Sequence, residues 1–512
     1  MGREMPGEPY DLAGKRLVFT NWYYIKPAFC WWYDKEGNFL DLKSSSYGPW
    51  EAEFQAKECP FGIRLAAQPA ERMGPILRPE HPWEEKGVSI SAVIHENGLY
   101  RGWGGCHSIE DDNHDCYFES NDGLHWERPN LGIVEFEGGC DNNFILNNPG
   151  SVFKDPSAPD DERYKGACSR DLTREEFEEY LKHRPDGWEP RADRAHKIAS
   201  ISGFVSPDGL RWKKLTQPLS VEHCDTQIVT YYDERLRKYV MYTRTTMVGP
   251  RSEKAPGEWS HESWAFPGRR AIGRGESEDF YHFPVSETII EPGPEMTPSD
   301  SLYTNCRTTI PGAPDHHLMF PSIYHQTDDT TSVTFLSSHD GKLWHTVPGS
   351  PVLRTAAFGE WDGGCVFAHP NLIELPNGDF ALPYTGFTFP HKYPRIQLRS
   401  ATGYAVWPKG RLIALEAPER GEFTTVKIMP PGRKLLINAL TQRAGSILVE
   451  VAGSDGKPIS GRAFEDSTPI IGDRHWTPIT WKESDDLGYK DGECITLRFR
   501  MDKAKIFGLE FR

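Results

Sequence analysis

Acidic residues recur at the same relative place in five parts of this chain. Each opens a run of residues with a strand-like pattern, and the positions are Glu84 or Glu85, Asp155, Asp225, Asp300, and Asp362 or Glu360. Carboxyl groups act as general acids, bases and nucleophiles when burial and neighbouring charges adjust their pKa values. If the five runs share an axis, the carboxylates crowd one cavity, and their repulsion raises the pKa of at least one of them. The spacing therefore predicts an acid–base site built from distant parts of the sequence.

A short repeated phrase indicates which elements carry these acids. The phrase reads Ser-x-Asp-Gly-x-x-Trp, and its copies span 120–126, 206–212 and 338–344. Asp-Gly favours a tight hairpin with positive φ angles, and each copy follows a run rich in β-branched or aromatic residues. Degenerate copies begin at Ser277 and Ser400, which makes about five modules at spacings of roughly 60 to 85 residues. We interpret the phrases as structural turns whose Trp packs between modules.

Five antiparallel modules predict an all-β fold, namely a five-bladed β-propeller whose innermost strands converge on one axis. After Thr424 the pattern changes to short alternating strands such as 434–438 and 446–451, which predict a C-terminal β-sandwich. We expect an N-terminal extension that packs on the propeller (residues 1–80), a catalytic propeller (81–415) and the sandwich (416–512). The only strong helix signal, Thr173 with Glu176 three residues later, is an insertion in the second module.

Composition narrows the classes of partner and compartment. A net charge of −16 in 512 residues argues against nucleic acid and anionic membranes and favours neutral or cationic small ligands. The 16 Trp and 20 Tyr residues suit both propeller cores and stacking against sugar rings. The N-terminus shows no apolar run of signal-peptide length, and the ten Cys residues form no CxxC pair, so we expect reduced thiols and a cytoplasmic location unless a leader was removed. No recognised metal-ligand spacing occurs, so no cofactor or metal is predicted, and no oligomeric state is implied.

This organisation resembles the five-bladed propeller glycoside hydrolases, which include fructofuranosidases (family 32) and arabinanases (family 43). The resemblance rests on the Asp-Gly-Trp turns, on Lys154-Asp155-Pro156, which is similar to the family's Arg-Asp-Pro, and on the joint between propeller and sandwich. The joint comprises the segments 403–405, 421–425, 435–439 and 469–473. The resemblance covers most of residues 80–512 and implies a carbohydrate substrate, with a furanosidic bond hydrolysed by two carboxylates in the central pocket.

Two departures indicate a divergent branch of that group. The chain lacks the Trp-Asn-Asp-Pro-Asn-Gly phrase that carries the fructofuranosidase nucleophile. Where the family has a Glu-Cys phrase for the general acid, this chain has Glu222-His223-Cys224-Asp225. Hydrolysis of sucrose or fructan is therefore not expected, and another glycoside fits better.

We assign the catalytic roles as a hypothesis. Glu84 is the nucleophile or base, Asp155 holds sugar hydroxyls and tunes its neighbours, and Asp225 is the acid. Asp362 is a second candidate for either chemical role. The predicted substrate-binding residues stand beside these acids or after the second or third strands of their modules, and they are Trp83, Arg170, Arg244, Asp300, Trp361 and His391.

Two other functions fit the same scaffold. A glycoside phosphorylase needs a basic phosphate pocket, which Arg170, Arg244 and Arg307 could supply, and its turnover would depend on phosphate. A noncatalytic propeller that binds sugar or protein would show ligand affinity without product. The five recurring acids favour an enzyme.

Overall fold

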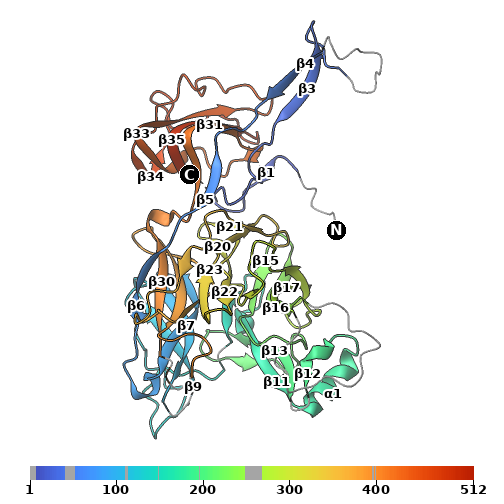
Figure 1. The fold of residues 1–512 in the computed structure, drawn as a ribbon, viewed down its shortest axis with the longest axis vertical. Coiled ribbons are helices and arrows are strands. Elements are labelled where there is room, and N and C mark those ends of the chain that lie inside the picture. Colours follow the sequence, from blue (N-terminus) through green and yellow to red (C-terminus); the bar gives the residue numbers. More distant parts are fainter. Residues whose placement is uncertain are drawn as a thin grey trace.

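The structure is a computed structural model, and it describes residues 7–40, 52–109, 113–147, 149–194, 197–247, 268–394, 397 and 399–512. It consists of a five-bladed β-propeller and a C-terminal β-sandwich, which lie one above the other along the long axis of the molecule (Figure 1). The predicted all-β fold class is therefore confirmed.

The first three blades follow one another along the chain as antiparallel sheets. Blade 1 contains β7 (Gly87–Glu96), β8 (Leu99–His107) and β9 (Asn113–Ser120). Blade 2 contains β10 (Ser151–Lys154), β11 (Tyr164–Leu172) and β13 (Lys197–Ser206), with the short strands β12 (Asp193–Arg194) and β14 (Lys213–Lys214). Blade 3 contains β15 (Val229–Asp233), β16 (Lys238–Thr246), β17 (Arg270–Ser277) and β18 (Glu287–Ile290).

Blade 4 is divided into two four-stranded sheets because each of its strands is interrupted. One sheet contains β19 (Asp300–Leu302), β22 (Ser322–His325), β23 (Thr330–Val333) and β26 (Leu353–Arg354). The other contains β20 (Arg307–Ile310), β21 (Ala313–Met319), β24 (Leu336–Ser338) and β25 (His345–Thr346). Blade 5 contains β27 (Cys365–Ala368), β29 (Phe380–Phe387) and β30 (Ser400–Trp407), with β28 (Ile373–Glu374) beside β29.

An N-terminal strand closes the ring of blades. Strand β6 (Glu71–Leu77) pairs antiparallel with β30, so residues that precede blade 1 form an outer strand of blade 5. A single parallel pair between Ser400 and Gly87 also joins these two blades. Closure of this kind leaves the propeller with only short, protected sheet edges.

The repeated Ser-x-Asp-Gly-x-x-Trp phrases form identical turns. In the blade 2 copy, the Ser206 Oγ accepts the backbone N–H of Gly209 at 2.9 Å, and the Asp208 carboxylate accepts two further backbone N–H groups, both at 2.9 Å. The glycine φ angles are 75°, 75° and 69° at Gly123, Gly209 and Gly341. A side chain at these positions would strain the backbone, which explains why the phrase contains glycine.

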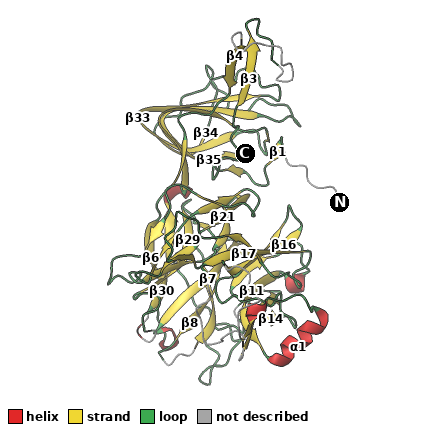
Figure 2. Ribbon diagram, turned by 45° about the vertical axis from the view of Figure 1, so that its right-hand side comes forward, coloured by secondary structure: helices red, strands yellow, loops and turns green. Residues whose placement is uncertain are grey.

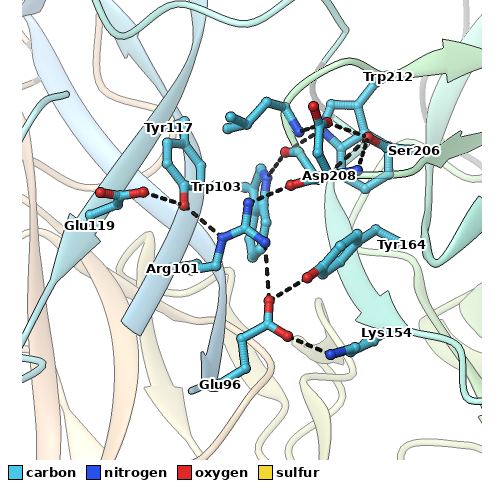
Figure 3. Close-up of polar contacts among 12 residues, drawn as sticks. Glu96, Arg101, Trp103, Tyr117, Glu119, Lys154, Tyr164, Ser206, Asp208 and Trp212 are labelled. Carbon is cyan, nitrogen blue, oxygen red and sulfur yellow. Dashed lines mark hydrogen bonds and ion pairs between the residues drawn. The ribbon is translucent and has the colours of Figure 1, made fainter. Parts of the chain in front are cut away.

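Each of these glycine carbonyls also accepts a hydrogen bond from an aromatic residue of the neighbouring blade. The Trp103 Nε1 donates to Gly209 O at 2.6 Å, Tyr242 OH to Gly341 O at 2.7 Å, and Tyr404 OH to Gly123 O at 2.8 Å. Figure 3 shows the contact between blades 1 and 2, where Arg101 also binds Tyr117, Glu96 and the Asp208 carbonyl. The repeated turns therefore connect adjacent blades as well as ending strands.

The C-terminal β-sandwich is built from long bent strands. These are β31 (Ile413–Thr424), β33 (Leu435–Ala452) and β35 (Thr496–Phe511), with β34 (Asp473–Pro478) at one edge. The pairing of β33 with β35 shifts register between Thr441 and Ser446, and both halves of β33 bury side chains such as Ile437 and Val449 in one core.

The first eighty residues contribute strands to both domains, whereas we expected them to pack on the propeller. Strand β6 joins the propeller, but β2 (Arg16–Leu17) pairs with β35 and β5 (Arg64–Ala67) pairs with β31. Strand β1 (Tyr10–Asp11) pairs with β32 (Ile428–Met429). Leu17 and Leu65 are buried in the same hydrophobic core as sandwich residues such as Ile437. Burial of these apolar side chains accounts for the placement of their strands. Strands β3 (Phe29–Asp34) and β4 (Ala52–Lys57) form a separate hairpin that projects beyond the sandwich (Figure 1).

The predicted helix insertion is present as α1 (Arg174–His183), at the periphery of the propeller (Figure 2). Thr173 accepts the backbone N–H of Glu176 at 3.2 Å, and the Glu176 carboxylate accepts that of Thr173 at 2.7 Å. Phe177 and Tyr180 pack against residues of blade 2 such as Ile198, so α1 covers the edge of that blade. Within the described ranges, no helix has the length and apolarity needed to cross a membrane.

Candidate active site

All five blades contribute to a central cavity of about 520 Å³. One lining residue from each blade, in chain order, is Ser89, Ser151, Asp225, Tyr303 and His369. These residues lie on or beside β7, β10, β15, β19 and β27, the innermost strands of the sheets. The structure thus brings residues from all five modules to one cavity, although most of the predicted acids are not among them.

Gln227 holds three blades together at the wall of this cavity. Its side-chain nitrogen donates to Ala368 O at 3.0 Å in blade 5, and its own carbonyl accepts Asn305 Nδ2 at 3.0 Å from blade 4. Its side-chain oxygen also accepts the backbone N–H of Cys306. These bonds fix the segment that carries Asp225 and Thr226, which precedes β15 and contributes directly to the cavity wall.

Among the described residues that line the central cavity, Asp225 is the one carboxylate. It forms an ion pair with Arg244, and Arg270 Nη1 lies 3.8 Å from the same carboxylate oxygen. Burial raises the pKa of Asp225, but the charges of Arg244 and Arg270 outweigh burial and hold the pKa below its usual value. Asp225 is therefore ionised at neutral pH.

A second cavity of about 590 Å³ adjoins the first and shares Asp225 and Tyr303 with it. Its described lining residues include three basic side chains, namely Arg244, Arg270 and Lys392. Asp225 is the carboxylate among those lining residues. The site therefore combines a mostly uncharged cavity with a cationic one on the other side of Asp225.

Aromatic and imidazole groups fix the boundary between the two cavities. The guanidinium of Arg270 lies 4.1 Å from the centre of the Tyr303 ring, a cation–π contact. The Tyr303 hydroxyl is hydrogen-bonded to His391 Nε2 at 2.6 Å. On the central wall, burial lowers the pKa of His369 to about 4, so its imidazole is neutral at pH 7 and bonds Thr385 Oγ1 at 2.7 Å.

The structure does not bring Glu84, Asp155 or Asp362 into the central cavity. Glu84 is fully buried, and its carboxylate is bound by Arg128 at 2.8 and 2.9 Å and by the backbone N–H of Glu80. Because these groups satisfy both oxygens, Glu84 anchors the segment that leads into β7.

Asp155 and Asp362 are likewise buried in structural networks. Asp155 follows the last residue of β10, whereas the cavity lies at Ser151, about 13 Å away along the strand. Its carboxylate accepts the Tyr239 hydroxyl at 2.7 Å and lies 3.5 Å from Lys165 Nζ. Asp362 accepts the Tyr384 hydroxyl at 2.9 Å and lies 3.6 Å from Arg72.

Of the predicted substrate-binding residues, Arg244 and His391 border the cavities. Arg170 is exposed, although its neighbour Ser169 lines the central cavity. Asp300 is hydrogen-bonded to His325 at 2.8 Å and does not line either cavity.

The two predicted sugar platforms are packing residues. Trp83 stacks on His81 and packs against Phe136 and Phe144 in the core of blade 1. Trp361 stacks on Tyr384. It also lies so close to Gly386 and Gly403 that a Cβ atom at either glycine would come within 2.4 or 2.7 Å of its ring.

Of the three arginines suggested for a phosphate pocket, only Arg244 lines a described cavity. The Arg307 guanidinium stacks 3.4 Å from the centre of the Tyr231 ring and donates to His317 at 2.9 Å, between blades 3 and 4.

Arg270 was not predicted from the sequence to be part of the site. Arg270 on β17 pairs with Thr246 on β16, and Thr246 lies two residues after Arg244 on the same strand. Because alternate residues of a strand share a face, both arginines lie on one face of blade 3. Within the described residues, no cluster of His, Cys, Asp and Glu is placed to hold a metal ion.

Several solved structures align with about two thirds of this chain at low sequence identity. A β-1,2-mannobiose phosphorylase from Listeria innocua has 12% identity and a TM-score of 0.42, covering 67% of this chain and 97% of that chain. An N-acetylgalactosamine deacetylase from F. plautii, solved with blood group B trisaccharide, has 12% identity and a TM-score of 0.38, covering 68% and 96%.

A thermostable family-43 glycoside hydrolase has 12% identity and a TM-score of 0.39, covering 65% of this chain and 93% of that chain. No protein-family model and no curated protein sequence matches the chain.

Proposed function

We propose that this protein cleaves a glycosidic bond in the central cavity, with Asp225 as the essential carboxylate. The observation that carries the proposal is the cavity itself, to which all five blades contribute and which has Asp225 on its wall. Its volume of about 520 Å³ lies within the range of small-molecule sites.

The lining suits a sugar. Hydroxyl groups of Ser89, Ser91 and Thr304 can exchange hydrogen bonds with sugar hydroxyls, while Phe367 and Phe387 offer apolar surface. The resemblance of the repeated turns and of the propeller–sandwich joint to the family 32 and 43 glycosidases agrees with this proposal and favours a furanosidic substrate.

Asp225 is better suited to act as an ionised group than as the acid we first assigned. A general acid must hold its proton at the working pH, which requires a raised pKa. The lowered pKa of Asp225 instead favours a nucleophile, a base toward water, or a group that stabilises the positive charge of an oxocarbenium-like transition state.

A panel of aryl glycosides tests the proposal. It should contain furanosides and pyranosides, including β-D-fructo-, arabino- and galactofuranosides, and release of the chromophore should be measured with wild type and with Asp225→Asn. We expect at least one substrate to be turned over by wild type only. Binding of sugars without product by wild type would favour the noncatalytic alternative and count against cleavage.

A further inference from the structure

The described lining of the cavity beside the proposed glycoside site carries an excess of positive charge. Arg244, Arg270 and Lys392 line it, and Asp225 is the one carboxylate among its described lining residues. The Arg244 side chain is only 3% exposed, so water screens its charge poorly. In a chain with a net charge of −16, this local concentration of cations needs an explanation.

Among the described lining residues, one carboxylate faces two arginines and cannot balance both charges. Asp225 contacts Arg244 directly, but Arg270 Nη1 remains 3.8 Å away, beyond hydrogen-bonding distance. Burial lowers the pKa of Arg244, and repulsion by the neighbouring Arg270 lowers it further. A second anion between the two guanidinium groups would relieve that repulsion.

Donor groups for such an anion are present. Among the described residues, Arg244 Nε and Arg270 Nη1 are buried without a hydrogen-bond partner. A buried donor left unpaired is costly, whereas guanidinium groups bind oxyanions through several N–H groups at once. Arg244 Nη2 also donates to His223 Nδ1 at 2.6 Å. Since a guanidinium group only donates, that His223 nitrogen must be an unprotonated acceptor, which helps to hold Arg244 in place.

The position of this cavity relates it to the proposed reaction. Asp225 and Tyr303 belong to the walls of both cavities, and the Tyr303 ring supports the Arg270 guanidinium from one side. A group bound between the arginines would therefore lie next to a sugar that contacts Asp225.

We propose that the Arg244–Arg270 cavity is an oxyanion subsite, which binds a phosphate, sulfate or carboxylate group beside the glycoside. The relation of the anion to a glycoside rests on the proposed function, whereas the anion binding itself does not. The anion is supplied either by a substituent of the sugar or by a free phosphate ion that takes part in cleavage.

Calorimetric titration of the full-length protein with sodium phosphate, sodium sulfate and sodium glucuronate, at constant ionic strength, tests the subsite without any turnover. We expect saturable binding of at least one of these anions, with one site per chain. Arg270→Met should weaken it at least tenfold, because a charge-assisted hydrogen bond is lost. Lys392→Met, at an exposed position, should weaken it severalfold, and Arg211→Met, a surface arginine paired with Asp208, should leave it unchanged.

The subsite does not exist if no anion binds saturably, or if both Arg270→Met and Lys392→Met bind as wild type does. Should Arg270→Met fail to fold, Lys392→Met still decides the question. If anions bind as expected but no glycoside is cleaved, the proposed function fails and the subsite stands.

Aryl glycoside assays then identify the source of the anion. If free phosphate is the source, turnover rises with phosphate and the product is a glycosyl phosphate, detectable by ³¹P NMR. In that reaction the bond from the anomeric carbon to the leaving aryl oxygen breaks, a bond from that carbon to a hydrogenphosphate oxygen forms, and the phosphate proton goes to the aryl oxygen, which leaves as a phenol. If the source is a substituent, glycosides that carry a carboxylate or sulfate are cleaved without phosphate and neutral ones are not. Either preference should be lost in Arg270→Met. The proposal would be overturned if turnover did not respond to free phosphate, to a charged substituent on the glycoside, or to Arg270→Met.

Discussion

Asp225 forms an ion pair with Arg244 in which the arginine side chain is 3% exposed and the carboxylate side chain is 39% exposed. The cation is thus fixed inside blade 3, while the carboxylate remains accessible from the cavities. Burial, together with the bond to His223, limits the conformations of Arg244, so the arginine orients Asp225 and keeps it ionised.

We expect Asp225→Asn to lower kcat by a factor of about 10² to 10⁴, the usual contribution of a positioned acid–base group. The amide keeps the shape of the side chain but cannot act as a base or nucleophile. Steady-state kinetics on the best substrate of the aryl glycoside panel would measure the loss. Asp171→Asn, an exposed residue paired with Lys197, is the matched control. Wild-type kcat in Asp225→Asn would rule out a chemical role for this residue.

Glu84→Gln should reduce stability rather than chemistry. Glu84 is fully buried and the Arg128 side chain is 8% exposed, so removing the negative charge leaves a buried cation whose remaining ion pair is with the exposed Glu80 carboxylate. Losses of about 3–5 kcal/mol are typical of such changes. Urea unfolding of the variant, compared with the exposed neighbour Glu85→Gln, would measure the effect. If Glu84→Gln keeps its stability and loses kcat in the folded protein, the catalytic role predicted from the sequence would be restored.

Glu222 should make stability fall as pH rises from about 4.5 to about 7. Burial raises its pKa from 4.5 to about 7 in the folded protein. Between these values the folded state holds a proton that the unfolded state has lost, so deprotonation favours unfolding, and the loss is complete above pH 7. Its size is on the order of 3 kcal/mol.

The variant Glu222→Gln mimics the protonated acid and tests this expectation. Its Tm should exceed that of wild type at pH 8 by more than it does at pH 5, whereas the exposed Glu287→Gln should show no such difference. Equal Tm differences at the two pH values would mean that Glu222 does not titrate in this range.

Tyr404→Phe should weaken the contact between blades 5 and 1. It removes one hydroxyl, which donates to Gly123 O at 2.8 Å in a fully buried position. Leaving that carbonyl without this donor should cost about 1–3 kcal/mol. The midpoint of urea unfolding would show the change, and Tyr23→Phe, at a partly exposed residue, serves as the control. No shift relative to Tyr23→Phe would show that the glycine carbonyls do not hold adjacent blades together.

Much of the fold could be predicted because its signals are local. The Asp-Gly turns at Gly123, Gly209 and Gly341 depend on bonds within a few residues, so the phrase itself indicates where blades end. Closure of the ring by β6 could not be predicted in this way, because the pairing of Met73 with Tyr404 joins segments far apart and leaves no phrase in the sequence.

The site was predictable only in part for a related reason. Asp225, Arg244 and His391 were identified from their places at strand ends, and they do border the cavities. Glu84 was placed beside them because acids recur near strand openings, but its contact with Arg128 arises from a loop that periodicity does not describe. The cationic cavity could not be predicted from the net negative charge of the chain, because a total charge does not indicate where individual residues such as Arg270 lie.

The pairing of β6 with β30 also bears on how the protein is made. Ribosomal synthesis delivers β6 before every other strand of the propeller, while its partner β30 is the last to emerge. During that interval the edge of β6 stays open to incorrect partners, and a long-range contact of this kind forms slowly. The ring of blades can therefore close only after residues up to Trp407 have left the ribosome, when all the other blades have already emerged.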